Sequence, residues 1–297
     1  MKDKSFFYII IVARDAGDKL AGTVEAALAQ SYPQRHVIVK DGASTDGSFG
    51  RLKETYGSDK RLTLMSGPDE GIYDAMNIAI DAALSHAKDL SESENAWCLF
   101  LNCGDLFHDR DVLKKADARI RQVRVRRAAR AHVAPDEYGV SLCYGDTFER
   151  KTGQIVSANP VIDDFACYRN LPCHQSILYA LSLLEKERYN TKWRIRADYE
   201  HFLRLRYVRH TEPAYLKMVI ADYEGGGYSE VNEDRSEKER QAIIRMYLPR
   251  KKVFAYDMYR ALSLQPLRAY LAENEKTAAL YQKIKRAVYK NREDMGI

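Results

Sequence analysis

The chain has 297 residues, of which 45% are hydrophobic and 30% charged, and its formal net charge is +5. These values suit a globular protein of one large domain with an appendage, or of two domains, and argue against a disordered chain. The five cysteines are odd in number and form no C-x-x-C pair, which argues against a disulfide framework and a structural zinc site and favours a reducing, cytoplasmic setting. No apolar run reaches about 18 residues, so the sequence predicts no membrane span.

The first hundred residues alternate strand-like apolar runs with helical periodicity. Strands are predicted at 6–13, 36–40, 61–66 and 96–102, with helices between them at 20–28, 49–56 and 72–83. Such alternation is typical of right-handed β-α-β units. The expected fold class is therefore α/β, with a mainly parallel central sheet and helices on both faces.

The second half is less regular, and its elements are predicted one by one. A long helix is expected from about 109 through the arginine-rich stretch 119–130, and another at 196–207. Strands are expected at 140–146, 154–158 and 216–223, and a turn that leads into a strand at 172–179. From Ser236 onward the pattern is helical and broken at Pro249 and Pro266. We expect a main domain over 1–232 and a basic helical C-terminal extension over 233–297.

Acidic residues follow three of the predicted parallel strands, at Asp15, at Asp41 and in "NCGD" (102–105). In open α/β sheets the carboxyl ends of the strands share one edge, and ligands bind there. Asp, Gly and Ser are also ordinary turn residues, so a simple turn is the alternative at each place. The stretch after Asp41 fits neither a calcium loop, because Ala43 lacks a side-chain oxygen, nor a nucleophile elbow, nor a phosphate-binding P-loop.

Three further places carry candidate functional groups. Asn102 and Asp105 present an amide oxygen and a carboxylate at one strand end, which suits a hard divalent ion bound partly by ligand phosphates. His174 follows a proline turn and is a ligand, a base or a structural imidazole. Asp198 and Glu200 begin a helix, where a carboxylate is either a general base or a partner of the helix dipole.

Five segments, in this order, carry a family resemblance: "QSYPQRHVIVKDGASTDGS", "PDEGIYDAMNIAI", "LFLNCGD", "CHQSILY" and "ADYEHFLRL". The chain resembles the inverting family 2 glycosyltransferases with the GT-A nucleotide-diphospho-sugar transferase fold, and looks most like the branch that builds colanic-acid-like and other exopolysaccharide, capsule or LPS-type units. The resemblance covers about residues 5–230. It implies transfer of a sugar from a nucleotide-diphosphate donor, with UDP favoured and GDP the alternative, to a glycan or lipid-linked acceptor.

The resemblance also implies roles for single residues. Asp198 is expected to be the catalytic base and Asp105 the ligand of Mn²⁺ or Mg²⁺. The remaining expected contacts are with the nucleotide-sugar, the nucleobase being read by Asp41: Asp15, Asp41, Asp69, Asp74, Asn77, Asn102 and His174. For Asp74 and Asn77, capping of a helix start is the alternative. Asp46 is expected to stabilise its turn or the next helix start.

Departures from the family pattern leave rival functions open. Only Asp105 supplies a carboxylate where many members show D-x-D, and neither the long arginine-rich helix nor the last sixty or so residues is explained. A non-catalytic nucleotide-sugar-binding module and a sugar-nucleotide pyrophosphorylase are the alternatives. Nucleic acid is not an expected partner, because no motif for it accompanies the basic stretches. The basic, tyrosine-rich extension predicts helical packing within the protein or in a homodimer, and peripheral contact with the inner membrane face is the alternative.

Overall fold

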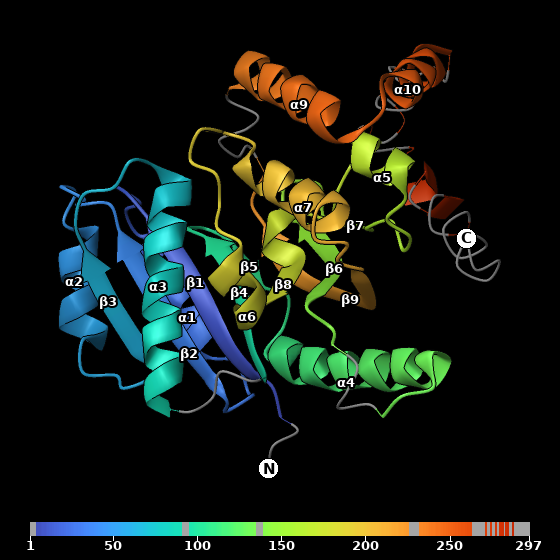
Figure 1. The fold of residues 1–297 in the computed structure, drawn as a ribbon. Helices are drawn as coiled ribbons and strands as arrows, with labels where there is room; N and C mark the ends of the chain where they lie inside the picture. The colour runs from blue at the N-terminus through green and yellow to red at the C-terminus, as the bar shows by residue number, and fades with distance from the viewer. Residues whose placement is uncertain are drawn as a thin grey trace.

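A computed structural model describes residues 4–90, 95–134, 139–225 and 232–262, together with scattered residues between 271 and 287. Within these residues nine strands form a single sheet with helices on both faces (Figure 1). The strands are β1 (Phe6–Ala13), β2 (Arg35–Asp41), β3 (Leu62–Ser66), β4 (Ala96–Asn102), β5 (Leu106–Phe107), β6 (Leu142–Glu149), β7 (Gln154–Val156), β8 (Ile177–Ala180) and β9 (Ala214–Tyr223). The helices are α1 (Lys19–Leu28), α2 (Ser48–Tyr56), α3 (Ile72–Leu90), α4 (Val112–Ala131), α5 (Asp164–Arg169), α6 (Leu181–Lys186), α7 (Ala197–Tyr207), α9 (Glu233–Tyr247) and α10 (Arg250–Leu262).

The strand order is β3-β2-β1-β4-β8-β6-β9-β5, and β7 pairs with β6. The first four strands in this order, β3, β2, β1 and β4, pair in parallel, which confirms the β-α-β units expected from the sequence. Beyond β4 the pairing is mixed, because β8 is antiparallel to both β4 and β6 whereas β6 and β9 are parallel. The α/β fold with helices on both faces is thus as predicted, and the parallel strands β3, β2, β1 and β4 form one half of the sheet.

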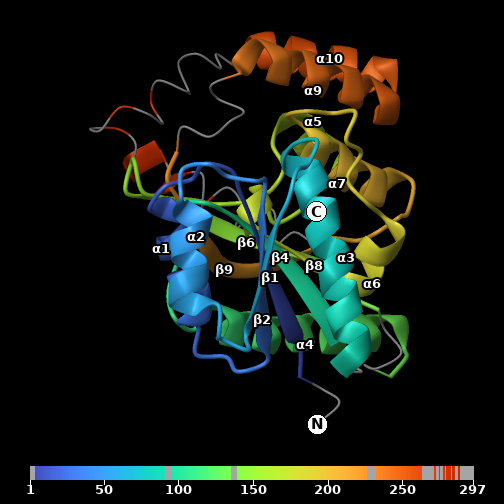
Figure 2. The same cartoon turned by 90° about the vertical axis from the view of Figure 1, so that its left-hand side faces the viewer.

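Both faces of the sheet are buried, which explains the unbroken apolar run of β1. Phe7, Ile9 and Ile11 point to one side, toward α1, α2 and α4. Tyr8 and Ile10 point to the other, toward α3 and α6. Figure 2, which views the sheet from the side, shows α1 and α2 on one face and α3, α6 and α7 on the other. The carboxyl ends of β1, β2 and β4 therefore meet along one edge of a fully covered sheet.

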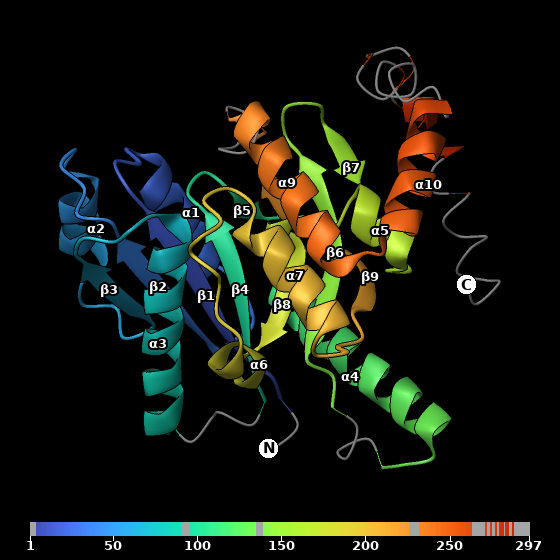
Figure 3. The ribbon, with the colours of Figure 1, turned by 45° about the horizontal axis from the view of Figure 1, so that its top comes forward.

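The two described C-terminal helices lie over that edge on the side of the second half of the chain (Figure 3). Helix α9 packs along α7, and α10 packs against α5. The Tyr168 hydroxyl donates to Asp257 Oδ1 at 2.6 Å, which joins α5 to α10. Pro249 separates α9 from α10, as the sequence predicted, whereas Pro266 lies outside the described residues. None of the described helices has both the length and the apolar character that crossing a bilayer requires.

Three short elements, β5, α5 and α6, were not expected from the sequence. Helix α5 has six residues and begins where Asp163 Oδ1 accepts a hydrogen bond from the amide of Ala166 at 2.7 Å. Strand β5 has two residues and pairs with β9, which brings the turn after β4 beside the end of β9. This pairing positions Asp105.

Candidate active site

The turn after β4 carries Asp105 to the sheet edge. The Asp105 amide donates to Asn102 O at 3.0 Å, and Gly104 takes a positive φ of 99° inside this turn. The Asp105 carboxylate accepts a 2.7 Å hydrogen bond from Gln175 Nε2 and a 3.3 Å bond from the Glu224 amide. Strands β4 and β9 and the segment before β8 therefore all contribute to the position of one carboxylate.

Asp105 and Asn102 could hold a metal ion together with other ligands. Burial raises the pKa of Asp105, although the bond from Gln175 opposes this shift. Asn102 Oδ1 is buried and has no hydrogen-bond partner within the described chain, so an amide oxygen beside the carboxylate is left to be satisfied. No set of three or more His, Cys, Asp or Glu side chains in the described residues is arranged as a metal site. The two oxygens fit a hard cation that takes its other ligands from a bound diphosphate.

A cavity of about 610 Å³ opens beside this turn. Four of the residues predicted from the sequence line it: Asn102, Asp105, His174 and Asp198. The fold thus places Asp198, in the first turn of α7, and Asp105, which follows β4, on the same cavity.

Three arginines also line the cavity: Arg169, Arg196 and Arg240. Arg196 Nε donates to Ser236 Oγ at 2.8 Å, and Arg240 Nη1 lies 3.1 Å from Glu237 Oε1. Guanidinium groups are suited to binding phosphate oxygens. The cavity therefore combines carboxylates with cations able to hold an anionic ligand.

One carboxylate oxygen of Asp198 is held by hydrogen bonds from neighbouring residues. Its Oδ1 accepts hydrogen bonds from the Tyr73 hydroxyl and the Tyr199 amide, both at 2.9 Å. The Tyr73 hydroxyl also lies 2.7 Å from Ile195 O, so its one hydrogen is shared between two acceptors. Asp198 Oδ2 makes no hydrogen bond to the described residues. A carboxylate held by one oxygen and unbonded at the other is arranged to accept a proton.

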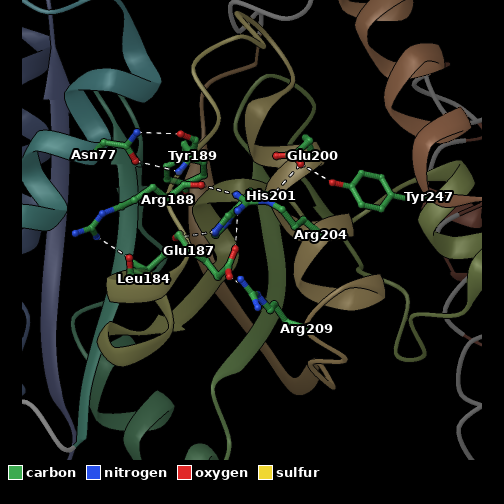
Figure 4. Close-up of polar contacts among 10 residues, drawn as sticks. All are labelled: Asn77, Leu184, Glu187, Arg188, Tyr189, Glu200, His201, Arg204, Arg209 and Tyr247. Atoms are coloured by element: carbon green, nitrogen blue, oxygen red, sulfur yellow. Dashed lines mark hydrogen bonds and ion pairs between the residues drawn. The ribbon is translucent and has the colours of Figure 1, made fainter.

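Glu200, the competing carboxylate of α7, is turned toward other groups (Figure 4). It is buried, its Oε1 accepts a hydrogen bond from the Tyr247 hydroxyl, and it lies 3.3 Å from Arg204 Nε. Glu200 does not line the cavity. The two residues lie two positions apart on a helix and hence on different faces, as expected.

His174 begins a short 3₁₀ turn (His174–Ser176) and stacks on Phe100, with ring centroids 5.2 Å apart. Neither ring nitrogen has a hydrogen-bond partner among the described residues, although both are buried. Burial lowers the pKa of His174, which keeps the imidazole neutral. A neutral imidazole with unmet hydrogen-bonding groups on a cavity wall is available to a ligand.

Asp41 ends β2 at the sheet edge, and Asp69 lies in the loop before α3; both belong to a tightly bonded group rather than to the cavity wall. Asp41 is fully buried and accepts bonds from Ser44 and from Ser66 Oγ at 2.6 Å. Asp69 Oδ2 forms a buried ion pair with Lys40 Nζ at 2.9 Å. Lys40 Nζ also donates to Asp41 O and Gly67 O, both at 2.7 Å. This lysine links the end of β2 to the loop before α3.

The other predicted donor residues also organise loops. Asp15 has a positive φ of 48°, and its Oδ1 accepts a 2.8 Å bond from the Thr45 amide, which ties the loops after β1 and β2. Asp74 Oδ2 accepts from the Glu70 amide at 2.9 Å at the start of α3. The side-chain amide of Asn77 donates through Nδ2 to Tyr189 O and accepts through Oδ1 from the Tyr189 amide, both at 3.0 Å. Asp15, Asp74 and Asn77 do not line the cavity, and their expected roles stay predictions.

Asp46 supports the loop in the way expected. It accepts bonds from the Ser48 amide at 2.9 Å and the Gly17 amide at 2.8 Å, and α2 begins at Ser48. Hydrogen bonds from Ser48, followed by that from Gly17, lower the pKa of Asp46 to about 2.

Sequence reasoning missed several groups at the cavity, including Tyr73, Gln175 and Arg196. Gln175 stands beside His174 in the motif "CHQS", so its polar amide in an apolar segment was a usable signal. Tyr73 lies on the apolar face of α3 and is buried, where an aromatic residue is normally read as core. Its contact with Asp198 joins residues 125 positions apart and leaves no local pattern.

Comparison with known proteins bears on this arrangement. Residues 8–125 match the family model described as Glycosyl transferase family 2. A PGL/p-HBAD biosynthesis glycosyltransferase of Mycobacterium bovis is 27% identical over 237 residues, which cover 77% of this chain and 81% of the relative. The motifs pointed to the colanic-acid and exopolysaccharide branch, whereas this relative is named for PGL/p-HBAD biosynthesis. The branch therefore stays a prediction.

Solved structures share the fold at low sequence identity. S. aureus TarS 1–349 has a TM-score of 0.60 at 15% identity, over 90% of this chain and 75% of that chain. The same protein in complex with UDP-GlcNAc gives a TM-score of 0.58 at 14% identity, over 90% of this chain and 76% of that chain. The mannosyltransferase PcManGT from Pyrobaculum calidifontis, in complex with GDP-Man and Mn²⁺, gives a TM-score of 0.57 at 16% identity, over 97% of this chain and 83% of that chain.

At these identities the structural likeness shows the fold alone, and that fold is the GT-A fold of glycosyltransferases. The family match is independent of it and covers most of β1, all of β2 to β4 and the loops that follow these strands. Over residues 8–125 the chain therefore matches glycosyltransferase family 2.

Proposed function

We propose that the protein transfers a sugar from a nucleotide-diphosphate donor to a hydroxyl group of a glycan or lipid-linked acceptor, with inversion at the anomeric carbon. The observation that carries this proposal is that Asp105 and Asp198 line one cavity. Structures with the same fold contain UDP-GlcNAc or GDP-Man, which supports a donor of that class. UDP is favoured and GDP is the alternative.

The proposed reaction is a single displacement. The acceptor hydroxyl attacks the anomeric carbon, the new C–O bond forms as the bond to the diphosphate breaks, and the nucleoside diphosphate leaves with the electron pair. Asp198 Oδ2 takes the hydroxyl proton, while Tyr73 and the Tyr199 amide hold Oδ1 in place. The departing diphosphate carries negative charge, which Arg169, Arg196 and Arg240 are available to stabilise.

We also propose that Asp105 and Asn102 hold a Mn²⁺ or Mg²⁺ ion with the donor. This assignment is supported by the Asn102 Oδ1 atom, which has no hydrogen-bond partner among the described residues, and by the buried Asp105 carboxylate beside it. When bound, the ion would neutralise charge on the diphosphate.

The acceptor is proposed only as a class. The motif resemblance points to an exopolysaccharide, capsule or LPS-type unit, and the matched relative is named for PGL/p-HBAD biosynthesis. For the C-terminal residues, packing within the protein or in a homodimer was expected first and a peripheral membrane contact second, and α9 and α10 do pack against α7 and α5. Exposed Phe254, Met258 and Leu262 on α10, with exposed Arg250 and Lys251 one turn before them, favour an anionic membrane.

The donor is tested by thermal stabilisation with UDP-GlcNAc, UDP-glucose and GDP-mannose, each with Mn²⁺, with Mg²⁺ and with excess chelator. One donor should raise the melting temperature more with the cation than with chelator, and Asp105→Ala should lose the cation-dependent part. Absence of stabilisation by every nucleotide-sugar, and by UDP and GDP, would contradict the proposal.

Turnover separates the rival functions. A transferase releases the nucleoside diphosphate, and the anomeric proton coupling of the product reports inversion. A binding module binds the donor without releasing nucleotide. A pyrophosphorylase instead exchanges pyrophosphate for sugar phosphate, which radiolabelled pyrophosphate would show.

A further inference from the structure

A carboxylate on α9 binds the segment that leads into the catalytic helix. Glu239 Oε2 accepts hydrogen bonds from the Ile195 amide at 2.9 Å and the Arg196 amide at 3.0 Å, and Oε1 accepts from the Arg194 amide at 3.1 Å. Glu239 is buried, so water does not compete freely for these amides. Three successive backbone groups are therefore held by one side chain.

These amides directly precede α7, which begins at Ala197. The N–H groups at the start of a helix have no partner within the helix, and a negative charge near them is favourable. Burial alone would raise the pKa of Glu239, but the bonds from the amides of Ile195, Arg196 and Arg194 outweigh it and lower the pKa, so the carboxylate stays ionised.

The same segment is held on its carbonyl side by the active site. Ile195 O lies 2.7 Å from the Tyr73 hydroxyl, which also bonds Asp198 Oδ1. Ile195 is thus fixed through its N–H by α9 and through its C=O by α3. A shift of this residue would move the Tyr73 hydroxyl and with it the Asp198 carboxylate.

Neighbours of Glu239 reinforce the contact. Arg235 Nε lies 3.2 Å from Glu239 Oε1, and Ser236 Oγ accepts a 2.8 Å bond from Arg196 Nε. The next residue on α9, Arg240, lines the cavity itself. Successive turns of α9 therefore contact the catalytic segment or the cavity.

We propose that Glu239 is a positioning residue for sugar transfer, holding residues 194–196 so that Asp198 keeps its unbonded oxygen in the cavity. This inference rests on the proposed function. It makes α9, which lies beyond the expected boundary at residue 232, part of the catalytic unit.

The kinetic test uses the full chain with Mn²⁺ and UDP-GlcNAc or GDP-mannose as probe, with water taking the acceptor's place, since water also needs the base. Glu239→Ala should lower kcat by about 10- to 100-fold with KM for the donor within about threefold. Glu239→Gln keeps one acceptor oxygen and should recover part of the loss. The control is Ile244→Val, which loosens the buried face of the same helix and should leave kcat near wild type.

Amide hydrogen exchange supplies a readout that does not require turnover. In Glu239→Ala, or in Glu239→Gln if the alanine variant does not fold, the amides of residues 194–196 should exchange at least about tenfold faster. They should not do so in Ile244→Val. Unchanged exchange, or equal loss of kcat in Glu239→Ala and the control, would overturn the inference while leaving the proposed function standing. If the wild-type protein hydrolyses no donor while the exchange result is as expected, Glu239 still holds residues 194–196, but its role in sugar transfer is overturned together with the proposed function.

Discussion

Asp198 and Glu200 show how two carboxylates in one helical turn come to differ. Asp198 keeps one oxygen unbonded to the described residues and lines the cavity, whereas Glu200 faces Tyr247 and Arg204 away from it. The sequence could name both residues but not choose between them, because the choice depends on which neighbours each face of α7 meets.

Replacing Asp198 by Asn keeps the shape and most hydrogen bonds but removes the proton acceptor. We expect turnover to fall by on the order of 10²- to 10⁴-fold while donor affinity, measured by calorimetry, changes little. Glu200→Gln should retain turnover and lose stability, since it weakens the contact with Arg204. The reverse pattern would assign the base to Glu200.

The side chains of Lys40 and Asp69 are both buried, so each charge is stabilised mainly by the other. Lys40→Met should cost about 3–5 kcal/mol of unfolding free energy, because it leaves the buried Asp69 carboxylate without its cation and removes the lysine's hydrogen bonds to Asp41 O and Gly67 O. The double variant Lys40→Met with Asp69→Leu should recover a large part of this loss. Denaturant titration of the three proteins measures it, and a single variant within about 1 kcal/mol of wild type would show that the pair is not coupled in this way.

At the scale of elements, the long strands and helices could be predicted and the short ones could not. Strand β1 was predicted with its observed bounds, since a buried strand of eight residues carries its own apolar signal. Helices α5 and α6 have six residues each, too few to show a period, and their positions depend on contacts with α10 and α3. The acidic loops of the site could be predicted because parallel strands end at the same edge of a sheet. The contact of Glu239 with residues 194–196 could not be predicted, because no sequence pattern near residue 195 indicates a partner on α9.

The contact of β2 with α3 includes two stacked histidines, His36 and His86, whose ring centroids lie 3.8 Å apart. His36 Nε2 lies 2.8 Å from Thr63 Oγ1, and His86 Nδ1 lies 3.0 Å from the Tyr8 hydroxyl. Burial, followed by the neighbouring His86, lowers the pKa of His36 to about 4, while Asp59 opposes the shift. The interface between β2 and α3 therefore favours the neutral form of His36.

A depressed histidine pKa has a definite effect on stability. Above the usual value of 6.5 the ring is neutral in both states and its contribution is complete; as the pH falls toward about 4 the unfolded chain takes up the proton first and that contribution is lost. The loss should be on the order of 3 kcal/mol. His36→Gln cannot become charged and should show a smaller fall in unfolding free energy between pH 7 and pH 4.5. An identical fall in both proteins would assign the pH dependence to other groups, such as buried His201.

At the scale of the whole molecule, the site joins the two halves of the chain. The first half supplies the parallel strands and Asp105, and the second supplies Asp198, the cavity arginines and the helices above them. The expected boundary at residue 232 divides the chain in sequence, but the contacts of α9 with the segment before α7 cross it.

Helix α10 exposes apolar side chains on its outer side, with Phe254 68% and Leu262 75% exposed. We expect the wild-type protein to sediment with anionic vesicles at low salt and less at high salt, because Arg250 and Lys251 add an electrostatic component. The double variant Phe254→Glu with Leu262→Glu should stay in the supernatant. No binding by the wild type at low salt would remove the membrane contact, and dimerisation lost in the double variant would indicate a second copy instead.

The strand order has a consequence for synthesis on the ribosome. Strands β1 to β4 are adjacent and complete once Asn102 has been made, yet the free edge of β4 is covered only when β8 (Ile177–Ala180) follows. A nascent chain that ends between these points presents an unpaired apolar edge to the cytosol, a known route to aggregation. Ribosome-stalled chains ending near residue 150 should therefore recruit chaperones and be cut readily by protease, whereas chains in which β8 has left the exit tunnel should resist both. The cell must protect this unfinished edge in the interval between the exit of β4 and the exit of β8 from the ribosome, during which the arginine-rich helix emerges.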